Sequence, residues 1–374
     1  MKIARIEMFQ VDLPYGGGTY ELSGGRVYTG FDGTIVCVTS DTGIEGWGES
    51  TPFGPNYIAA HARGVRAGIA EMAPHLLGRD PQAADRINDA MDEALTGHNH
   101  AKAAIDCAVW DLFGKSVGLP VCTLLGGGTG KRLPTISSIY AGAPDDMRTR
   151  VADHRAKGYR GHSIKIGAAE EEGGPVLDAE RIAASLADRQ PGEYFIVDAN
   201  GGLVPENALR MLRALPEGLD FVLEAPCATW RETISLRQRC SVPIVLDELA
   251  ENDADLAMLL SHDVADGVGL KITKAGGLAR ARRHRDLCSA AGLTMSVQDT
   301  TGSTLAFAAI VHMGATVPTR LLRCILDTRD IIPFQVGSFD APVEAGGVLP
   351  PSKPGLGVTV NRNLIGDPVD VWEA

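Results

Sequence analysis

Seven short apolar runs between residues 162 and 327 each end in a charged or polar side chain. Neighbouring end points lie 23 to 33 residues apart, which leaves room for a strand, a turn, a helix and a second turn. Strands of a parallel sheet are buried on both faces and therefore consist of continuous apolar runs. The spacing predicts a (β/α) barrel, in which the carboxyl ends of the strands meet at one face. The runs end at Lys165, Asp198, Glu224, Asp247, Lys271, Gln298 and Asp327.

Five successive runs end in the order Lys, Asp, Glu, Asp, Lys. One charged residue at such a place often marks only the point where a strand leaves the core. An ordered series is more informative, because the functional residues of barrel enzymes gather at this face. We interpret the series as a catalytic site.

The length of 374 residues exceeds the ~250 residues at which one hydrophobic core usually stops growing, so a second domain is expected. The net charge of -12 disfavours nucleic acid and anionic membranes as partners, because both would repel the chain. The seven cysteines form no CxxC pair, so we expect neither a disulfide framework nor a zinc site. No run approaches ~18 apolar residues and charges interrupt the first segment, so neither a membrane span nor a signal peptide is expected. We expect a cytoplasmic protein.

Three regions differ in their patterning. Residues 1–47 alternate apolar and polar side chains around turn signals, which predicts a strand, a loop and an antiparallel hairpin. Residues 58–118 follow a spacing near 3.6 and are predicted to be helical. Strands and helices then alternate from residue 133 to about 325. The expected division is an α+β capping domain at 1–125, a barrel at 126–327 and a tail at 328–374 that folds back onto the first domain.

Two loops of the first region are unusual. Residues 14–25 are rich in glycine, and residues 50–57 combine two prolines with aromatic side chains. Such segments are commonly mobile surface loops. In a barrel enzyme they can instead cover the open end and exclude water. Tyr20, Phe53 and Tyr57 are therefore candidate substrate contacts.

The three acidic strand ends indicate a metal site. Asp198, Glu224 and Asp247 present carboxylate oxygens, which Mg²⁺ binds together with waters or substrate oxygens. Three carboxylates this close would otherwise repel each other and raise one or more pKa values, so a cation is the simplest way to keep them ionised. We predict one Mg²⁺ per subunit. The alternative is a metal-free network of salt bridges to the lysines.

Lys165 and Lys271 lie on either side of the carboxylates in strand order. If the carboxylate of a substrate binds the metal, its α-carbon lies between the two ammonium groups. One lysine can then remove a proton while the other delivers one. A partly desolvated lysine near a cation has its pKa lowered toward ~7 to 8, where it serves as a general base. The metal would stabilise the enediolate that forms, and Lys274 is expected to lie beyond the strand.

With these strand ends, several motifs resemble the muconate lactonising enzyme subgroup of the enolase superfamily over nearly the whole chain. The resemblance implies a capping α+β domain built from both termini, a modified (β/α)7β TIM barrel, Mg²⁺ on the three carboxylates and acid/base roles for the two lysines. The motifs are LLGGG at 124–128, DANG at 198–201, the acidic pair Asp247 and Glu248, and LKITKAGG at 270–277.

The resemblance also assigns supporting roles and shows one departure. It places Asn200 and Glu248 behind the metal ligands. Members often carry Lys-x-Lys on the second barrel strand, but here the first position is Ser163. A cationic neighbour that would lower the pKa of Lys165 is therefore missing, while its role as a base is retained.

A closer resemblance is to members that act on proline derivatives, the hydroxyproline betaine epimerases and the cis-3-hydroxy-L-proline dehydratases. It is carried by WGESTPFGPNY and TGHNHAKAAIDCAVWDL. A quaternary ammonium is usually held by aromatic faces, but aromatic residues make up only 5% of this chain and no tryptophan ends a barrel strand. A free ring nitrogen would instead bind Asp299 or Asp327. We therefore expect a proline derivative with a free nitrogen.

The expected reaction is dehydration of cis-3-hydroxy-L-proline to a pyrroline carboxylate by an Mg-dependent hydro-lyase. In this substrate the α-hydrogen and the hydroxyl lie on opposite ring faces, which suits two lysines across the ring. Without a leaving group the same pair would return a proton to the other face. Epimerisation of proline betaine or hydroxyproline betaine, and of dipeptides held by Asp327, therefore stay open. A metal-retaining binding protein is the non-enzyme alternative, and we expect a homo-oligomer.

Two smaller motifs stay ambiguous. Gly276 and Gly277 either cradle an anion at the start of the next helix or form a tight turn. His98 and His100 are expected to begin a helix or to pack at a domain junction, because no thiol or carboxylate stands at ligand spacing.

Overall fold

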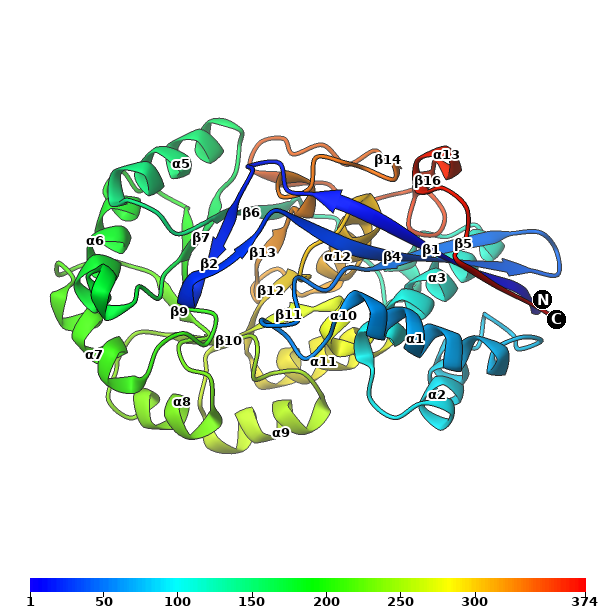
Figure 1. Cartoon of the computed structure of the whole chain (residues 1–374), viewed down its shortest axis with the longest axis horizontal. Coiled ribbons are helices and arrows are strands. Elements are labelled where there is room, and N and C mark those ends of the chain that lie inside the picture. Colours follow the sequence, from blue (N-terminus) through cyan, green and yellow to red (C-terminus); the bar gives the residue numbers. More distant parts are fainter.

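The computed structural model describes residues 1–374. The solvent exposure of Gly24 alone lies outside this description. Eight parallel strands, β6 to β13, form a closed barrel, because the last strand pairs with the first (Figure 1). This confirms the expected barrel. The strands are β6 (Leu133–Ile139), β7 (Gly161–Lys165), β8 (Tyr194–Asp198), β9 (Val222–Glu224), β10 (Ile244–Leu246), β11 (Gly267–Lys271), β12 (Thr294–Gln298) and β13 (Leu322–Leu326).

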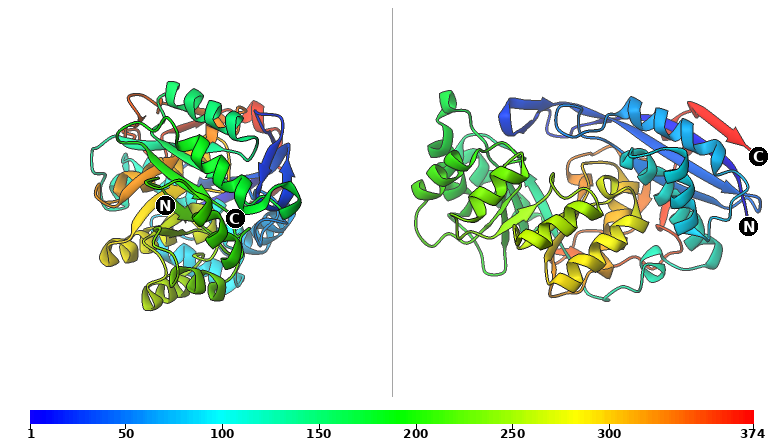
Figure 2. Two further views of the ribbon diagram at one scale, coloured as in Figure 1. Left: turned by 90° about the vertical axis from the view of Figure 1, so that its left-hand side faces the viewer. Right: turned by 90° about the horizontal axis from the view of Figure 1, so that it is seen from below.

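Helices follow the first seven barrel strands, and a short 3-10 turn at Thr328–Asp330 follows the eighth, so the barrel is of the (β/α)7β type. The helices surround the strands (Figure 2). They are α5 (Pro144–Ala156), α6 (Gly174–Leu186), α7 (Pro205–Ala214), α8 (Trp230–Arg237), α9 (Asp253–His262), α10 (Ile272–Ala275), α11 (Leu278–Ala291) and α12 (Thr304–Thr316).

A second, antiparallel sheet belongs to the N-terminal region. Its strand order is β17-β1-β4-β5, so the last strand of the chain pairs with the first and the two termini lie side by side (Figure 1). The expected return of the tail to the first domain is thus present, whereas the exact domain bounds stay a prediction. The strands are β1 (Ile3–Pro14), β4 (Gly30–Ser40), β5 (Glu45–Ser50) and β17 (Asp370–Glu373), and the helices packed with them are α1 (Ala62–Met72), α2 (Ala84–Ala94) and α3 (Asn99–Val117).

A small hairpin, β2 (Tyr20–Leu22) and β3 (Arg26–Tyr28), extends from this domain over the barrel (Figure 1). The Ser23 hydroxyl between its strands donates to the carbonyl of Ile166, just past β7. The Arg26 guanidinium donates to the carbonyl of Asn200 at 3.3 Å, just past β8. The glycine-rich segment is therefore anchored at the carboxyl ends of the barrel strands.

The remaining short elements lie in the connection to the barrel and in the tail. Among the described residues, none of the helices combines the length and apolar character needed to cross a membrane. The short elements are α4 (Val121–Leu124), β14 (Gly337–Phe339), β15 (Gly347–Val348), β16 (Val358–Val360) and α13 (Arg362–Ile365).

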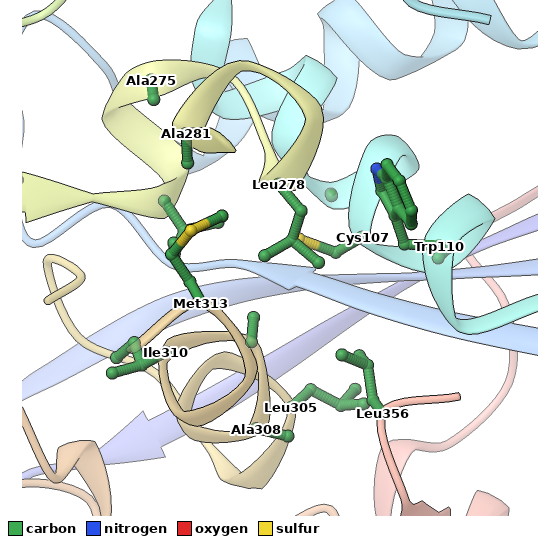
Figure 3. Close-up of a cluster of buried hydrophobic side chains, with 14 of the residues drawn as sticks. Cys107, Trp110, Ala275, Leu278, Ala281, Leu305, Ala308, Ile310, Met313 and Leu356 are labelled. Carbon is green, nitrogen blue, oxygen red and sulfur yellow. The ribbon is translucent and has the colours of Figure 1, made fainter. Parts of the chain in front are cut away.

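One hydrophobic core spans the two domains. Cys107 and Trp110 of α3 pack beside Leu278 of α11, and Leu305 of α12 and Leu356 of the tail complete the cluster (Figure 3). Burying a side chain such as Leu278 stabilises the fold by roughly 1.5–3 kcal/mol. The domains are therefore held together by the same kind of packing that forms their interiors.

Within the N-terminal domain, the backbones of β5 and α3 approach each other closely. A Cβ atom on Gly48 would lie 2.1 Å from the carbonyl oxygen of Ala104 and 2.6 Å from the amide nitrogen of Ala108. Only glycine lets the strand pack this close to the helix backbone.

We expect Gly48→Ala to lower the free energy of unfolding by about 1–3 kcal/mol or more, because helix backbone cannot move aside as a side chain can. Urea unfolding measures the change. Gly128→Ala is the matched control, since its Cβ would meet its nearest neighbours at 3.7 Å. Equal stability of the two variants would contradict the packing described here.

Candidate active site

The barrel topology places the two predicted catalytic lysines across from each other. Lys165 ends β7 and Lys271 ends β11, and these strands are four apart in either direction around the eight-stranded barrel. Both side chains line one small cavity of about 40 Å³. Such a volume holds a few waters, so a substrate needs the covering residues to move.

The predicted metal ligands fill the arc between the lysines on one side. Asp198 and Glu224 are direct partners on the adjacent strands β8 and β9, and Asp247 follows β10. Asp198 forms an ion pair with Lys165, and Asp247 forms one with Lys271 at 2.5 Å. The structure therefore brings all five predicted residues to the same end of the barrel.

Lys274 is a member of this cluster that the sequence did not identify. It lies on α10, beyond the strand as expected, but its ammonium is buried and bonds the Oδ1 atom of Asp247 at 2.6 Å. Asp247 thus lies between two lysines. A signal was present, because residues three apart share one face of a helical turn, and Lys274 follows Lys271 by three.

Glu224 has no directly bonded cation among the described residues. Its Oε1 atom accepts from the amide of Gln298 at 3.1 Å. Burial, followed by the negative charges of Asp198 and Asp247, raises the pKa of Glu224 well above its ordinary value. The approach of the carboxylates needs a glycine, because a Cβ on Gly269 would lie 2.9 Å from Glu224 Oε1 and 3.4 Å from the Cβ of Asp247.

The oxygen donors at this end of the barrel suit a divalent cation in part. In the part of the chain that the structure describes, no three Asp, Glu, His or Cys side chains converge into a preformed site. Asp198 and Asp247 instead face lysines, as in the metal-free alternative. Glu224 lies outside this network, and one buried side-chain oxygen of each of Glu248 and Asn200 has no partner. Uncompensated carboxylate and amide oxygens are the chemistry that suits Mg²⁺.

The pKa values of Lys165 and Lys271 differ from expectation. Burial by itself lowers the pKa of Lys165, but the charge of Asp198 outweighs it and holds this pKa above its ordinary value. For Lys271, burial again lowers the pKa, and the charge of Asp247 raises it. The pKa of Lys271 is therefore also held well above its ordinary value. The expected lowering is therefore reversed here, because carboxylates are the nearest charges. A lysine becomes a base only when its carboxylate is engaged elsewhere.

Tyr57 joins the capping domain to this cluster. Its hydroxyl donates to Glu248 Oε1 at 2.7 Å and accepts from Lys271 at 3.1 Å. The Asn200 amide donates to the same Glu248 oxygen at 3.2 Å and to Asp198 Oδ2 at 3.0 Å. Asn200 therefore contacts the predicted ligand Asp198, and Glu248 is connected to Lys271 through the hydroxyl of Tyr57.

Aromatic side chains line the cavity, which corrects one premise of the sequence argument. Tyr20, Phe53 and Tyr57 surround it together with Ser163. Ring centroids are 5.3 Å apart for Tyr20 and Phe53 and 5.8 Å apart for Phe53 and Tyr57. These rings come from the two capping-domain loops in which they are candidate substrate contacts, and not from the barrel strand ends.

Asp299 and Asp327, the expected partners of a ring nitrogen, are engaged elsewhere. Asp299 lines the cavity but accepts from the amides of Thr273 at 3.2 Å and Thr300 at 2.7 Å. Both oxygens of Asp327 accept from Arg329 at 2.9 Å, and Asp327 is not one of the cavity residues. Neither presents a free carboxylate to the cavity.

Asp299 should leave a signature in the pH dependence of stability. Burial raises its pKa to about 6 from the ordinary 3.8. As pH rises from about 4 to about 6, the unfolded chain loses this proton first, so the folded state becomes less stable. Asp299→Asn removes the effect.

We therefore expect the stability of the wild type relative to Asp299→Asn to fall as pH is raised through this window. Urea unfolding of both proteins at pH 4 and pH 7 measures it, and comparing the two proteins cancels the other titrating groups. A difference that is the same at both pH values would contradict the burial of this carboxyl group.

Two family descriptions match the chain. Residues 146–364 match "Enolase C-terminal domain-like", and residues 31–126 match "Mandelate racemase / muconate lactonizing enzyme, N-terminal domain". A protein of Roseovarius nubinhibens, solved in complex with magnesium, is 54% identical, with a TM-score of 0.98 over 100% of both chains. The cis-3-hydroxy-L-proline dehydratase of Roseibium aggregatum is 37% identical over 99% of both chains. The N-succinyl-L-Arg/Lys racemase of Bacillus cereus is 26% identical over 98% of this chain and 97% of its own.

Proposed function

Because the chain belongs to the mandelate racemase/muconate lactonizing enzyme family of the enolase superfamily, we propose that it removes the α-proton of a small carboxylate substrate. Lys165 and Lys271 are the proposed acid and base. The observation that carries this proposal is their position on opposite sides of one cavity, with the acidic residues along one arc between them. A base on each side of a carbon is what transfer of a proton to or from either face needs.

Asp198, Glu224 and Asp247 are the proposed ligands of Mg²⁺. When bound, the ion would stabilise the negative charge that develops on the substrate carboxylate as the α-proton leaves. Support comes from the buried carboxylate of Glu224, which has no cationic partner among the described residues, and from the relative solved with magnesium. Lys274 would keep Asp247 in place while Lys271 acts on the substrate.

The proposed reaction is dehydration of cis-3-hydroxy-L-proline. One lysine, as the free amine, takes the α-proton from one ring face. The other, as the ammonium, protonates the hydroxyl that leaves from the opposite face as water. The carbon–oxygen bond breaks as the double bond forms, and the resulting enamine tautomerises to a pyrroline carboxylate. Support comes from the full-length similarity to a dehydratase of this substrate.

We expect the protein with Mg²⁺ to convert cis-3-hydroxy-L-proline to a product smaller by one water, followed by NMR and mass spectrometry. Lys165→Ala and Lys271→Ala should each lower kcat by about 10²- to 10⁴-fold, because each removes one proton-transfer group. Lys131→Ala, at an exposed lysine, is the control and should retain activity. Chelation with EDTA should abolish turnover, and added Mg²⁺ should restore it.

Loss of activity in the Lys131 control, or full activity without either buried lysine, would contradict these roles. Absence of α-hydrogen exchange in deuterated water with every carboxylate tried would contradict an enzymatic function altogether.

Epimerisation at C2 of a quaternary ammonium substrate, such as proline betaine, is the second candidate. Aromatic faces attract such cations. Tyr20, Phe53 and Tyr57 line the cavity, while Asp299 and Asp327 are bound to other groups. This aromatic lining favours a betaine substrate, whereas the low aromatic content of the sequence disfavoured one.

Phe53→Leu separates the two candidates. If a betaine is the substrate, the loss of a cation–π contact should lower kcat/KM for proline betaine by about 2- to 30-fold. The value for cis-3-hydroxy-L-proline, measured in parallel, should change less. Phe31→Leu is the matched control, because Phe31 packs on Phe53 at 4.5 Å between ring centroids but does not line the cavity. No turnover of proline betaine by the wild type would exclude this candidate.

A further inference from the structure

Helix α11, which follows the Lys271 strand after the short turn α10, starts without a cap of its own. The N-cap residue of α11 is Gly277, which has no side chain to accept from the first free backbone amides. Asp106 of α3, from the other domain, fills this role, because its Oδ2 atom accepts from the amide of Ala279 at 3.1 Å. Asp106 is fully buried, and its Oδ1 atom accepts from Asn88 at 2.6 Å.

Gly277 is required by this contact. Its φ of +117° is in the region that side chains avoid, and a Cβ would lie 2.4 Å from Asp106 Oδ2. The sequence left two interpretations open, an anion at a helix start and a tight turn. Both hold, and the anion is a carboxylate of the chain itself.

The segment between Lys271 and Gly277 is held by α3 at a second point. It forms the single turn α10, and the side-chain amide of Asn99 donates to the carbonyl of Lys274 at 3.0 Å. Asn99 and Asp106 lie on the same helix, α3. The turn that leads away from Lys271 is therefore fixed from the capping domain. Figure 2 shows α11 in yellow beside the cyan helices of that domain.

A similar contact occurs at the next barrel helix, where no lysine is involved. Glu49 of β5 accepts from the amide of Ser303 at the start of α12 at 2.8 Å. Gly302, with a φ of +144°, would place a Cβ 2.8 Å from Glu49 Oε1. The strand before α12, β12, ends in Gln298, so this contact provides a matched comparison.

We propose that Asp106 is a positioning residue that fixes Lys271, and that it governs proton transfer on one face of the substrate only. The proposal rests on the proposed function. Loss of the cap would let the start of α11 move, and with it the turn after Lys271. A displacement of about 1 Å at a reacting group costs about 100-fold in rate. Lys165 stands four strands away on β7, so its proton transfer should be retained.

The test is Asp106→Ala, which removes the accepting oxygens, assayed by exchange of the α-hydrogen of L-proline and of D-proline in deuterated water with Mg²⁺. Lys271→Ala shows which enantiomer of proline depends on Lys271, because exchange of that enantiomer disappears. For that enantiomer we expect Asp106→Ala to lower the exchange rate by about 10- to 100-fold. The other enantiomer should stay within about threefold of the wild type.

Two further variants separate positioning from general loss of structure. Gly277→Ala breaks the same contact from the other side and should give the same one-handed loss. Glu49→Ala removes the matched cap at α12 and should not give a one-handed loss, because no lysine ends β12. Equal loss for both hands in Asp106→Ala and Gly277→Ala, or no loss in either, would overturn the proposal.

Amide hydrogen–deuterium exchange of the folded protein gives a readout independent of turnover. Asp106→Ala should speed exchange in residues 271–282 and leave residues 161–166 unchanged. If the wild type exchanges neither hand of proline while this pattern appears, the proposed function fails on these substrates and the positioning of the segment stands. If substrate exchange occurs and the pattern is absent, the positioning role fails alone.

Discussion

Repulsion among three buried carboxylates is the constraint on which the site depends. Asp198 and Asp247 are compensated by lysines, whereas Glu224 is bonded only by the amide of Gln298 among the described residues. Leaving a buried carboxylate without a cation is costly, so the arrangement favours binding of a divalent ion. The same charges raise the pKa of both catalytic candidates. In the proposed site, metal binding and base strength would be linked, because a carboxylate engaged by a cation no longer holds the proton on its lysine.

The capping domain contributes more than a cover. It supplies the aromatic lining of the cavity, and the hydroxyl of Tyr57 bonds both Lys271 and Glu248. It also supplies the carboxylates of Asp106 and Glu49, which cap the barrel helices after β11 and β12. Since the last strand of the chain pairs with the first, the end of the tail belongs to the same sheet as the capping domain.

The barrel could be predicted from the sequence because a strand that is buried on both faces consists of a continuous apolar run. The runs ending at Lys165, Asp198 and Lys271 end there in the structure as well. Contacts between segments far apart in the chain could not be read in this way. Asp106 and Ala279 are 173 residues apart, and Tyr57 and Lys271 are 214 apart. Nothing in the local pattern pairs them. The partners of Asp299 and Asp327 are likewise visible only in the fold, and the roles expected for these two residues stay predictions.

A crystal structure of the protein grown with Mn²⁺, with an anomalous difference map, tests the central claim most directly. The account predicts one strong peak bonded to oxygens of Asp198, Glu224 and Asp247, with the ammonium groups of Lys165 and Lys271 released toward the cavity. A map with no peak between these carboxylates, and with both lysines still paired to them at saturating metal, would contradict it.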